Sequence, residues 1–172
     1  SPMTRDTAID TAFVGTAQRD ENTPLIEGVV VSPVTQNVDD RQNLMVYLKE
    51  SDPFYQGFAQ SYVSVTAEGV VKAWHYHLKQ TDIWVVPAGK IKVGLFDARE
   101  TSETRGVANS IIMGGGRCVT LAIPPGVFHG YVSLTPECVL INTTDRPYDA
   151  DDEFRAPWDD PRFEFDWGVE NR

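Results

Sequence analysis

Residues 69–89 read GVVKAWHYHLKQTDIWVVPAG, in which two short apolar runs lie on either side of a polar turn. Runs of this length and composition predict two β-strands joined by a turn. Successive side chains of a strand point to opposite faces, so His75 and His77 lie on the same face of the first strand, and Lys72 lies on the other face. Asp82 follows at the start of the second strand. The stretch therefore predicts two imidazoles and a carboxylate close together in a β-sheet protein.

A third histidine, His129, follows the Pro-Pro-Gly turn of residues 123–131, IPPGVFHGY. Two imidazoles on one strand face, a carboxylate and a third imidazole are side chains that bind Fe, Mn, Ni, Co, Cu or Zn. His75, His77, Asp82 and His129 are therefore candidate ligands of a divalent transition metal. The alternative is that some of these histidines lie in the core or bind substrate.

Similar short runs of β-branched and aromatic residues, separated by Gly, Pro, Asn or Asp, continue along the chain. Many short strands at close spacing predict an all-β sandwich or barrel, with at most short helical segments. We expect an irregular N-terminal arm over residues 1–28, and one domain over 29–172 with an acidic C-terminal tail. The predicted strands are Val29–Val34, Leu44–Leu48, Phe58–Val65, Val70–His77, Ile83–Pro87, Lys90–Asp97, Val107–Met113, Cys118–Ile123, Phe128–Leu134 and Cys138–Asn142.

The composition is that of a single globular domain. The chain has 172 residues and a net charge of −10, which argues against sequence-independent binding to nucleic acid and to an anionic membrane surface. No apolar run reaches the roughly 18 residues of a membrane span. Two cysteines, Cys118 and Cys138, do not make a disulfide framework, so we expect reduced thiols in a cytoplasmic protein.

The spacing of the histidines resembles two motifs of the cupin superfamily. Gly69, His75, His77 and Asp82 match its first motif, with Asp in place of the usual Glu, and residues 124–129, PPGVFH, match the second, P-x-G-x-x-H. The resemblance implies a cupin jelly roll or β-barrel. In metal-binding cupins, the residues that correspond to His75, His77, Asp82 and His129 are the metal ligands.

Several segments resemble, more narrowly, the dTDP-4-dehydrorhamnose 3,5-epimerases, which are metal-free cupin dimers acting on nucleotide-linked 4-keto sugars. The segments are VVKAWHY (70–76), IPPGVFHGY (123–131), TDRPY (144–148) and WDDP (158–161) followed by FDW (165–167). The resemblance implies that His75 abstracts the proton and that Tyr148 is the second catalytic residue. It also implies substrate contacts for Arg41, Gln60 and Lys72.

Other positions depart from the epimerase pattern. The family's active-site Lys has no counterpart, His77 replaces a Gln, and the segment with the Asp that orients the catalytic His has no match. A metal-bound imidazole has its lone pair occupied and cannot also act as a general base. His75 is therefore expected to be either a ligand or the base, but not both.

Three functions remain open from the sequence. The first is an isomerase or epimerase of a sugar or sugar-like carbonyl compound, with or without a dTDP or UDP group and with or without metal assistance. The second is an Fe(II)-type cupin oxygenase, and the third is a catalytically silent binding cupin. In each case we expect a small-molecule ligand and a homodimer, because closed all-β domains must protect their edge strands.

Overall fold

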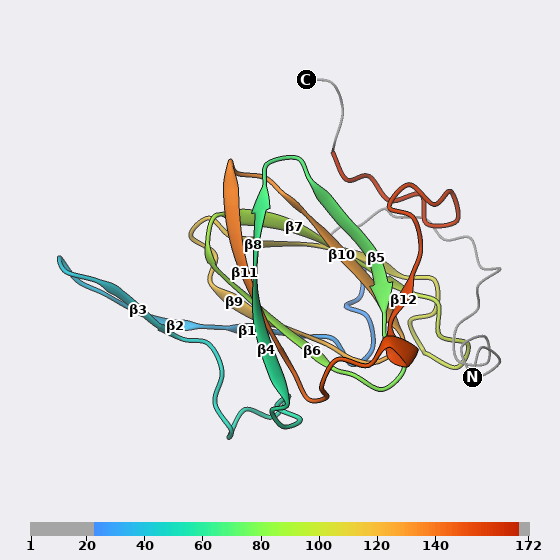
Figure 1. Cartoon of the computed structure of the whole chain (residues 1–172), viewed down its shortest axis with the longest axis horizontal. Helices are drawn as coiled ribbons and strands as arrows, with labels where there is room; N and C mark the ends of the chain where they lie inside the picture. Colours follow the sequence, from blue (N-terminus) through green and yellow to red (C-terminus); the bar gives the residue numbers. More distant parts are fainter. Residues whose placement is uncertain (1–22, 169–172) are drawn as a thin grey trace.

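The computed structural model describes residues 23–168, which form two facing five-stranded antiparallel sheets with a separate two-stranded hairpin (Figure 1). One sheet has the strand order β1-β9-β6-β11-β4 and the other has the order β12-β5-β10-β7-β8. The elements of this range are β1 (Val30–Pro33), β2 (Thr35–Val38), β3 (Asn43–Val46), β4 (Gln60–Ala67), β5 (Val71–Tyr76), β6 (Asp82–Ala88), β7 (Lys90–Asp97), β8 (Ala108–Gly114), β9 (Val119–Ile123), β10 (Val127–Ser133), β11 (Glu137–Thr144), the 3-10 helix η1 (Ala150–Asp152) and β12 (Phe154–Arg155).

The all-β cupin-like jelly roll predicted from the sequence is confirmed. Each of the ten predicted strands corresponds to an observed one, β1 and β3 to β11. Two further strands were not predicted. β2 (TQNV) is polar and exposed along its length, and β12 pairs over only two residues, so neither has an apolar pattern that marks a strand.

Two large apolar cores, and a smaller cluster of Phe54, Ile83 and Ala122, hold this architecture together. The first fills the space between the sheets and includes Trp84, Ile91, Leu95 and Leu121. The second lies on the outer side of β5 and β10, where Trp74 and Phe128 pack against aromatic residues of the C-terminal tail. The centroid of the Trp74 ring lies 5.1 Å from that of Phe163 and 5.0 Å from that of Trp167. The tail therefore closes one face of the second sheet.

The structure describes only the last residues of the N-terminal arm predicted over residues 1–28. Residues 1–22 lie outside the described range, so the arm and its packing on a partner stay a prediction. Within the described part, Ile26 is buried, and its backbone N–H donates to Asn109 Oδ1 over 2.9 Å.

Cys118 and Cys138 are free thiols. No helix between residues 23 and 168 is long and apolar enough to cross a membrane.

Candidate active site

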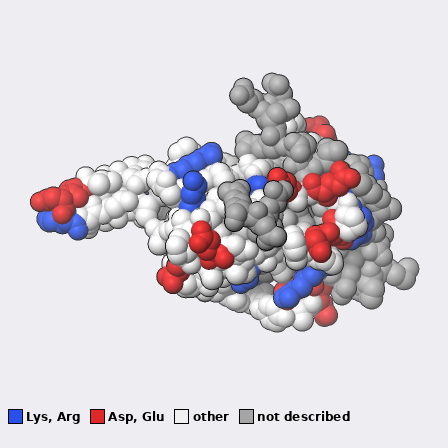
Figure 2. Space-filling view, turned by 90° about the horizontal axis from the view of Figure 1, so that it is seen from above, with Lys and Arg blue, Asp and Glu red and all other residues white. Residues whose placement is uncertain are grey.

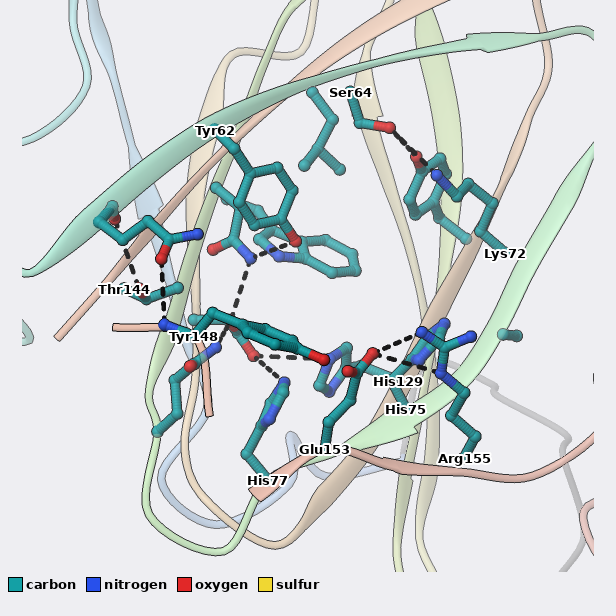
Figure 3. Close-up of a pocket in the computed structure, with 18 of the residues that line it drawn as sticks. Tyr62, Ser64, Lys72, His75, His77, His129, Thr144, Tyr148, Glu153 and Arg155 are labelled. Atoms are coloured by element: carbon teal, nitrogen blue, oxygen red, sulfur yellow. Dashed lines mark hydrogen bonds and ion pairs between the residues drawn. The ribbon is translucent and has the colours of Figure 1, made fainter. Parts of the chain in front are cut away.

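A cavity of about 600 Å³ opens between the two sheets, and Trp84, Tyr131 and Leu140 of the first core form part of its lining. It is lined from both sides, by β4, β6 and β11 of one sheet and by β5, β10 and β12 of the other (Figure 3). His75, His77 and His129 all line it, with ring centroids 6.3 Å apart for His75 and His129 and 5.7 Å apart for His77 and His129. The shared face predicted for the histidines is therefore present.

His75 lies near the end of β5, where its backbone pairs with His129 on β10 and with Arg155 on β12. Burial lowers the pKa of His75, and the positive charge of Arg155 lowers it further, while Glu153 opposes the shift. A lowered pKa keeps the ring neutral at pH 7, because the protonated form loses hydration and meets a cation. His75 is therefore able to accept a proton.

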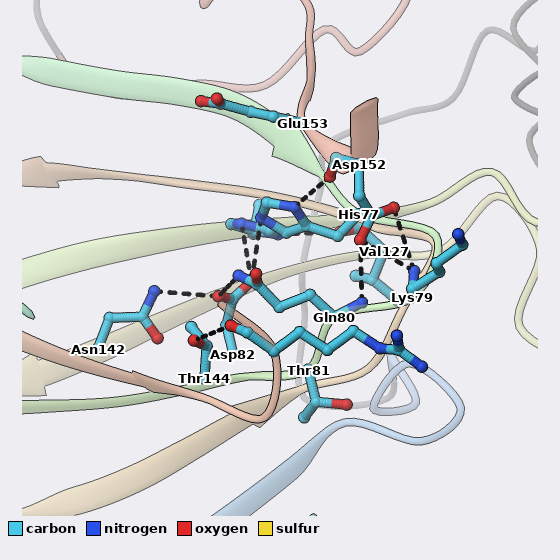
Figure 4. Close-up of polar contacts among 12 residues, drawn as sticks. His77, Lys79, Gln80, Thr81, Asp82, Val127, Asn142, Thr144, Asp152 and Glu153 are labelled. Atoms are coloured by element: carbon cyan, nitrogen blue, oxygen red, sulfur yellow. Dashed lines mark hydrogen bonds and ion pairs between the residues drawn. The ribbon is translucent and has the colours of Figure 1, made fainter. Parts of the chain in front are cut away.

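His77, Asp82 and His129 form a compact group among the residues that line the cavity. Figure 4 shows the ring of His77 directed toward Asp82. The Nε2 atoms of both histidines lie 3.5 Å from Oδ2 of Asp82. The other carboxylate oxygen, Oδ1, accepts hydrogen bonds from the side-chain amides of Gln80, over 2.8 Å, and Asn142, over 3.0 Å. The carboxylate is thus fixed by two amides and faces two imidazoles.

The hydrogen bond at Nδ1 of each imidazole determines its tautomer, and therefore whether the nitrogen facing Asp82 is a donor or an acceptor. Nδ1 of His77 donates to the carbonyl of Asp152 over 2.6 Å, and Nδ1 of His129 donates to the carbonyl of Val127 over 3.0 Å. In a neutral imidazole the other nitrogen is then an acceptor. The Oδ2 atom of Asp82 is buried without a hydrogen-bond partner and faces both of these ring nitrogens. Burial lowers the pKa of His129 to about 4, although Asp82 raises it.

Tyr148 lies at the mouth of the cavity, on the segment between β11 and η1. Figure 3 shows its ring across the opening, with the hydroxyl directed toward the side on which His75, Glu153 and Arg155 lie. The carboxylate of Glu153, toward which the hydroxyl points, raises the pKa of Tyr148. The predicted base and the second predicted catalytic residue therefore line one cavity.

Of the three predicted substrate-binding residues, Gln60 and Lys72 line the cavity. Strand alternation predicts that Lys72 faces away from the histidines, and this prediction was wrong. The pairing of β10 with β5 shifts register between His129 and Tyr131, so that three residues of β5 span two residues of β10. This irregularity brings Lys72 to the cavity, where its ammonium group donates to Ser64 Oγ over 3.3 Å.

Arg41, in contrast, does not line the cavity of its own chain. It lies in the turn between β2 and β3, where its guanidinium group pairs with Asp39 over 2.8 Å. Figures 1 and 2 show the β2–β3 hairpin projecting from the body of the molecule, with charged side chains gathered at its tip. Within one chain, Arg41 is therefore not part of the site.

The sequence interpretation missed several lining residues. Tyr62 and Ser64 face the cavity because they alternate with Gln60 along β4, a signal that the sequence did contain. Glu153 and Arg155 gave no such signal, because they reach the cavity through the two-residue strand β12 and its preceding turn.

Comparison with known proteins places these features in a family. The model of the family described as dTDP-4-dehydrorhamnose 3,5-epimerase matches residues 23–172. The spore coat polysaccharide biosynthesis protein SpsL of Bacillus subtilis is 39% identical over 152 residues, which cover 86% of this chain and 100% of SpsL. The probable low-salt glycan biosynthesis epimerase Agl13 of Haloferax volcanii is 38% identical, covering 86% of this chain and 97% of Agl13.

A solved structure agrees with the sequence comparisons. The crystal structure of a dTDP sugar isomerase from Desulfovibrio desulfuricans G20 superposes with a TM-score of 0.80 at 30% identity. The match covers 85% of this chain and 94% of that one. The resemblance to the epimerases inferred from the motifs is thus confirmed.

The predicted divalent transition metal (Fe, Mn, Ni, Co, Cu or Zn) is wrong as a cofactor. The matching family consists of cofactor-independent epimerases. Of the four predicted ligands, His77, Asp82 and His129 bring ligand atoms within 4.8 Å of one another, but His75 does not belong to this group. The oxygenase alternative, which depended on that metal, is overturned with it.

Proposed function

Because the chain belongs to the dTDP-4-dehydrorhamnose 3,5-epimerase family, it is a sugar epimerase, and we propose that its substrate is a dTDP- or UDP-linked sugar carrying a ketone. The D. desulfuricans protein with the similar structure is described as a dTDP sugar isomerase. The observation that carries the proposal is the pairing of His75, whose pKa is lowered by burial, with Tyr148 in one cavity.

In the proposed reaction, His75 removes a proton from the carbon beside the ketone. The C–H electron pair moves onto the carbonyl oxygen and forms an enolate, while the imidazole becomes an imidazolium. Tyr148 then donates its hydroxyl proton to the opposite face of the same carbon, which inverts the centre and restores the ketone. Exchange with water returns both side chains to their starting state. A base and an acid held in place contribute roughly 10²–10⁴-fold each to such a reaction.

The nucleotide is proposed to bind through Gln60, Lys72 and Arg41. Lys72 offers a positive charge at the cavity wall, and Gln60 lies beside Tyr148 at its mouth. Arg41 is 78% exposed in its side chain and lies at the tip of the projecting hairpin. It therefore reaches a nucleotide only in the cavity of a second copy of the chain.

We further propose that the protein is a homodimer. The hairpin exposes Val38, Leu44 and Val46, and the edge strand β4 exposes Val63 and Val65. β4 lies at the end of its sheet, so its outer edge has no neighbouring strand among the described residues. Exposed apolar surface on an unprotected edge is stabilised by a second subunit. The free thiols of Cys118 and Cys138 support a cytoplasmic location for this dimer.

Calorimetric titration tests the ligand, and light scattering tests the assembly. Wild type should bind dTDP or UDP, and Arg41→Ala should weaken binding by roughly 1.5–3 kcal/mol, the usual contribution of a hydrogen bond to a charged group. The matched control is Arg117→Ala, because Arg117 lies in the loop between β8 and β9 and does not line the cavity. A monomer at assay concentration, or no binding of either nucleotide, would contradict these proposals.

A further inference from the structure

Tyr148 is poorly fixed by packing. Its side chain lies on a connecting segment and the residue is 68% exposed, so neighbouring apolar groups do not hold the ring in one orientation. A proton donor that is free to rotate spends little time in the productive geometry, and small misplacements of a catalytic group cost large factors in rate. If Tyr148 is the acid, polar contacts must hold it.

Two polar contacts meet this need, one for the backbone and one for the hydroxyl. The backbone N–H of Tyr148 donates to Oε1 of Gln60 on β4 over 3.0 Å. The hydroxyl points across the cavity mouth toward the carboxylate of Glu153 (Figure 3), and this carboxylate raises the pKa of Tyr148. The ring is therefore bridged across the opening, between the two sheets.

Glu153 is itself firmly held. It lies between η1 and β12, and β12 is anchored to β5 by the pairing of Arg155 with His75 and of Phe154 with Tyr76. Its Oε1 atom accepts from the Arg155 guanidinium group over 2.5 Å and 3.2 Å. On the other side, the buried carboxylate of Asp152 accepts three backbone N–H groups from residues 78–80. The position of Glu153 is thus tied to the strand that carries the predicted base.

We propose that Glu153 is a positioning residue that holds the Tyr148 hydroxyl over the cavity and keeps it protonated until the proton is transferred. The proposal rests on the proposed function, because it assigns a partner to the acid of that reaction. A carboxylate accepts the hydroxyl hydrogen and opposes the formation of a neighbouring tyrosinate. Arg155 pairs with Glu153 and keeps this acceptor ionised.

The charges around Tyr148 define what should be measured. Glu153 and Asp149 raise the pKa of Tyr148, and Arg155 lowers it. Removing the charge of Glu153 while keeping its shape, as in Glu153→Gln, should therefore lower this pKa. The ionisation of Tyr148 can be observed without any substrate, as the ultraviolet difference titration between a protein and its Tyr148→Phe variant.

The experiment compares two such differences, wild type against Tyr148→Phe and Glu153→Gln against the double variant. We expect the Tyr148 midpoint at lower pH in Glu153→Gln. Glu137→Gln, a change at an exposed glutamate outside the cavity, should leave it unchanged. Equal midpoints with and without Glu153 would overturn the proposal. Because no substrate is used, this result stands whether or not the epimerase reaction is found.

The rate of inversion and its pH profile together distinguish a positioning role of Glu153 from a structural one. In Glu153→Gln, inversion of the sugar should fall about tenfold or more, a part of the 10²–10⁴-fold that a general acid contributes. The basic limb of its pH profile should move to lower pH, and Glu153→Asp should recover part of the rate. A fall in rate with an unmoved basic limb would indicate a structural role only and would refute the proposal. Wild type that inverts no dTDP- or UDP-linked keto sugar would instead refute the proposed function.

Discussion

Gly130 lies beside His129 on β10, where this strand passes close to Ala73 of β5. A Cβ atom built at Gly130 would lie 2.3 Å from Cβ of Ala73, 2.7 Å from Cα of Ala73 and 2.8 Å from the carbonyl oxygen of Lys72. Carbon atoms in contact normally lie about 3.5–4.0 Å apart, so Gly130→Ala must separate the two strands by at least about 1 Å. Most of the contacting atoms are backbone atoms, which cannot move aside by rotating.

The strain should appear in both stability and activity. Overpacking of a core typically costs about 1–3 kcal/mol, and a clash with backbone atoms is expected at the upper end of this range. For a chain of this size, about 3 kcal/mol corresponds to a fall in Tm of roughly 6–12 °C. The displaced segment of β5 leads directly to His75. A misplacement of about 1 Å should therefore lower kcat by about 10²-fold.

Thermal unfolding and epimerase kinetics of four proteins measure this effect. Adding Ala73→Gly to Gly130→Ala removes the shortest contact and should recover part of both losses. Gly116→Ala is the matched control, because no atom lies within 4 Å of its Cβ position and the residue is outside the cavity. Its φ of +95° costs stability but should leave kcat unchanged. A Gly130→Ala protein with wild-type Tm and kcat would refute the reasoning.

Three further predictions follow from the groups around the cavity. The pKa of His129 falls from 6.5 to about 4 on folding. Between these two pH values the unfolded chain therefore binds a proton that the folded chain does not. The free energy of unfolding should fall by up to about 3 kcal/mol as the pH is lowered from 6.5 to 4. Urea unfolding should show a shallower pH dependence in His129→Asn, and an unchanged dependence would count against a buried neutral ring. Asp152→Ala leaves three backbone N–H groups of residues 78–80 without their acceptor and should lower the free energy of unfolding by about 3 kcal/mol. Asp152→Asn should lower it by an intermediate amount. A decrease below about 0.5 kcal/mol for Asp152→Ala in urea unfolding would be inconsistent with these contacts. Exhaustive treatment with a chelator should leave epimerase activity unchanged, as expected for a cofactor-independent family, whereas a loss restored by added metal would contradict that assignment.

The sequence predicted the strands well because most of them carry a strong local signal. Runs such as Lys90–Asp97 combine β-branched and aromatic residues with turn residues at both ends, and β7 has these bounds in the structure. The spacing of His75 and His77 was sufficient to predict a shared face. β12 could not be predicted, because a strand of two residues is determined by its pairing with β5 rather than by its own composition.

The errors at the site arose from features that a one-dimensional pattern does not contain. The face of Lys72 depends on a register shift between two strands, which reverses the alternation expected for a regular strand. The metal prediction followed from side chains that are all able to bind a metal. The pattern does not show that Asp82 is held by Gln80 and Asn142, or that both imidazoles donate to carbonyls on their far side. Those hydrogen bonds appear only in the folded chain.

The central claim is that His75 removes a proton from the carbon beside the ketone of a nucleotide-linked sugar. The most direct measurement is the rate at which a dTDP-linked 4-keto sugar incorporates deuterium from D₂O, followed by NMR for wild type and His75→Asn. Wild type should exchange the proton at the inverted carbon, and His75→Asn should exchange it at least about 10²-fold more slowly, the lower bound for a general base. Exchange by His75→Asn at the wild-type rate would contradict the claim.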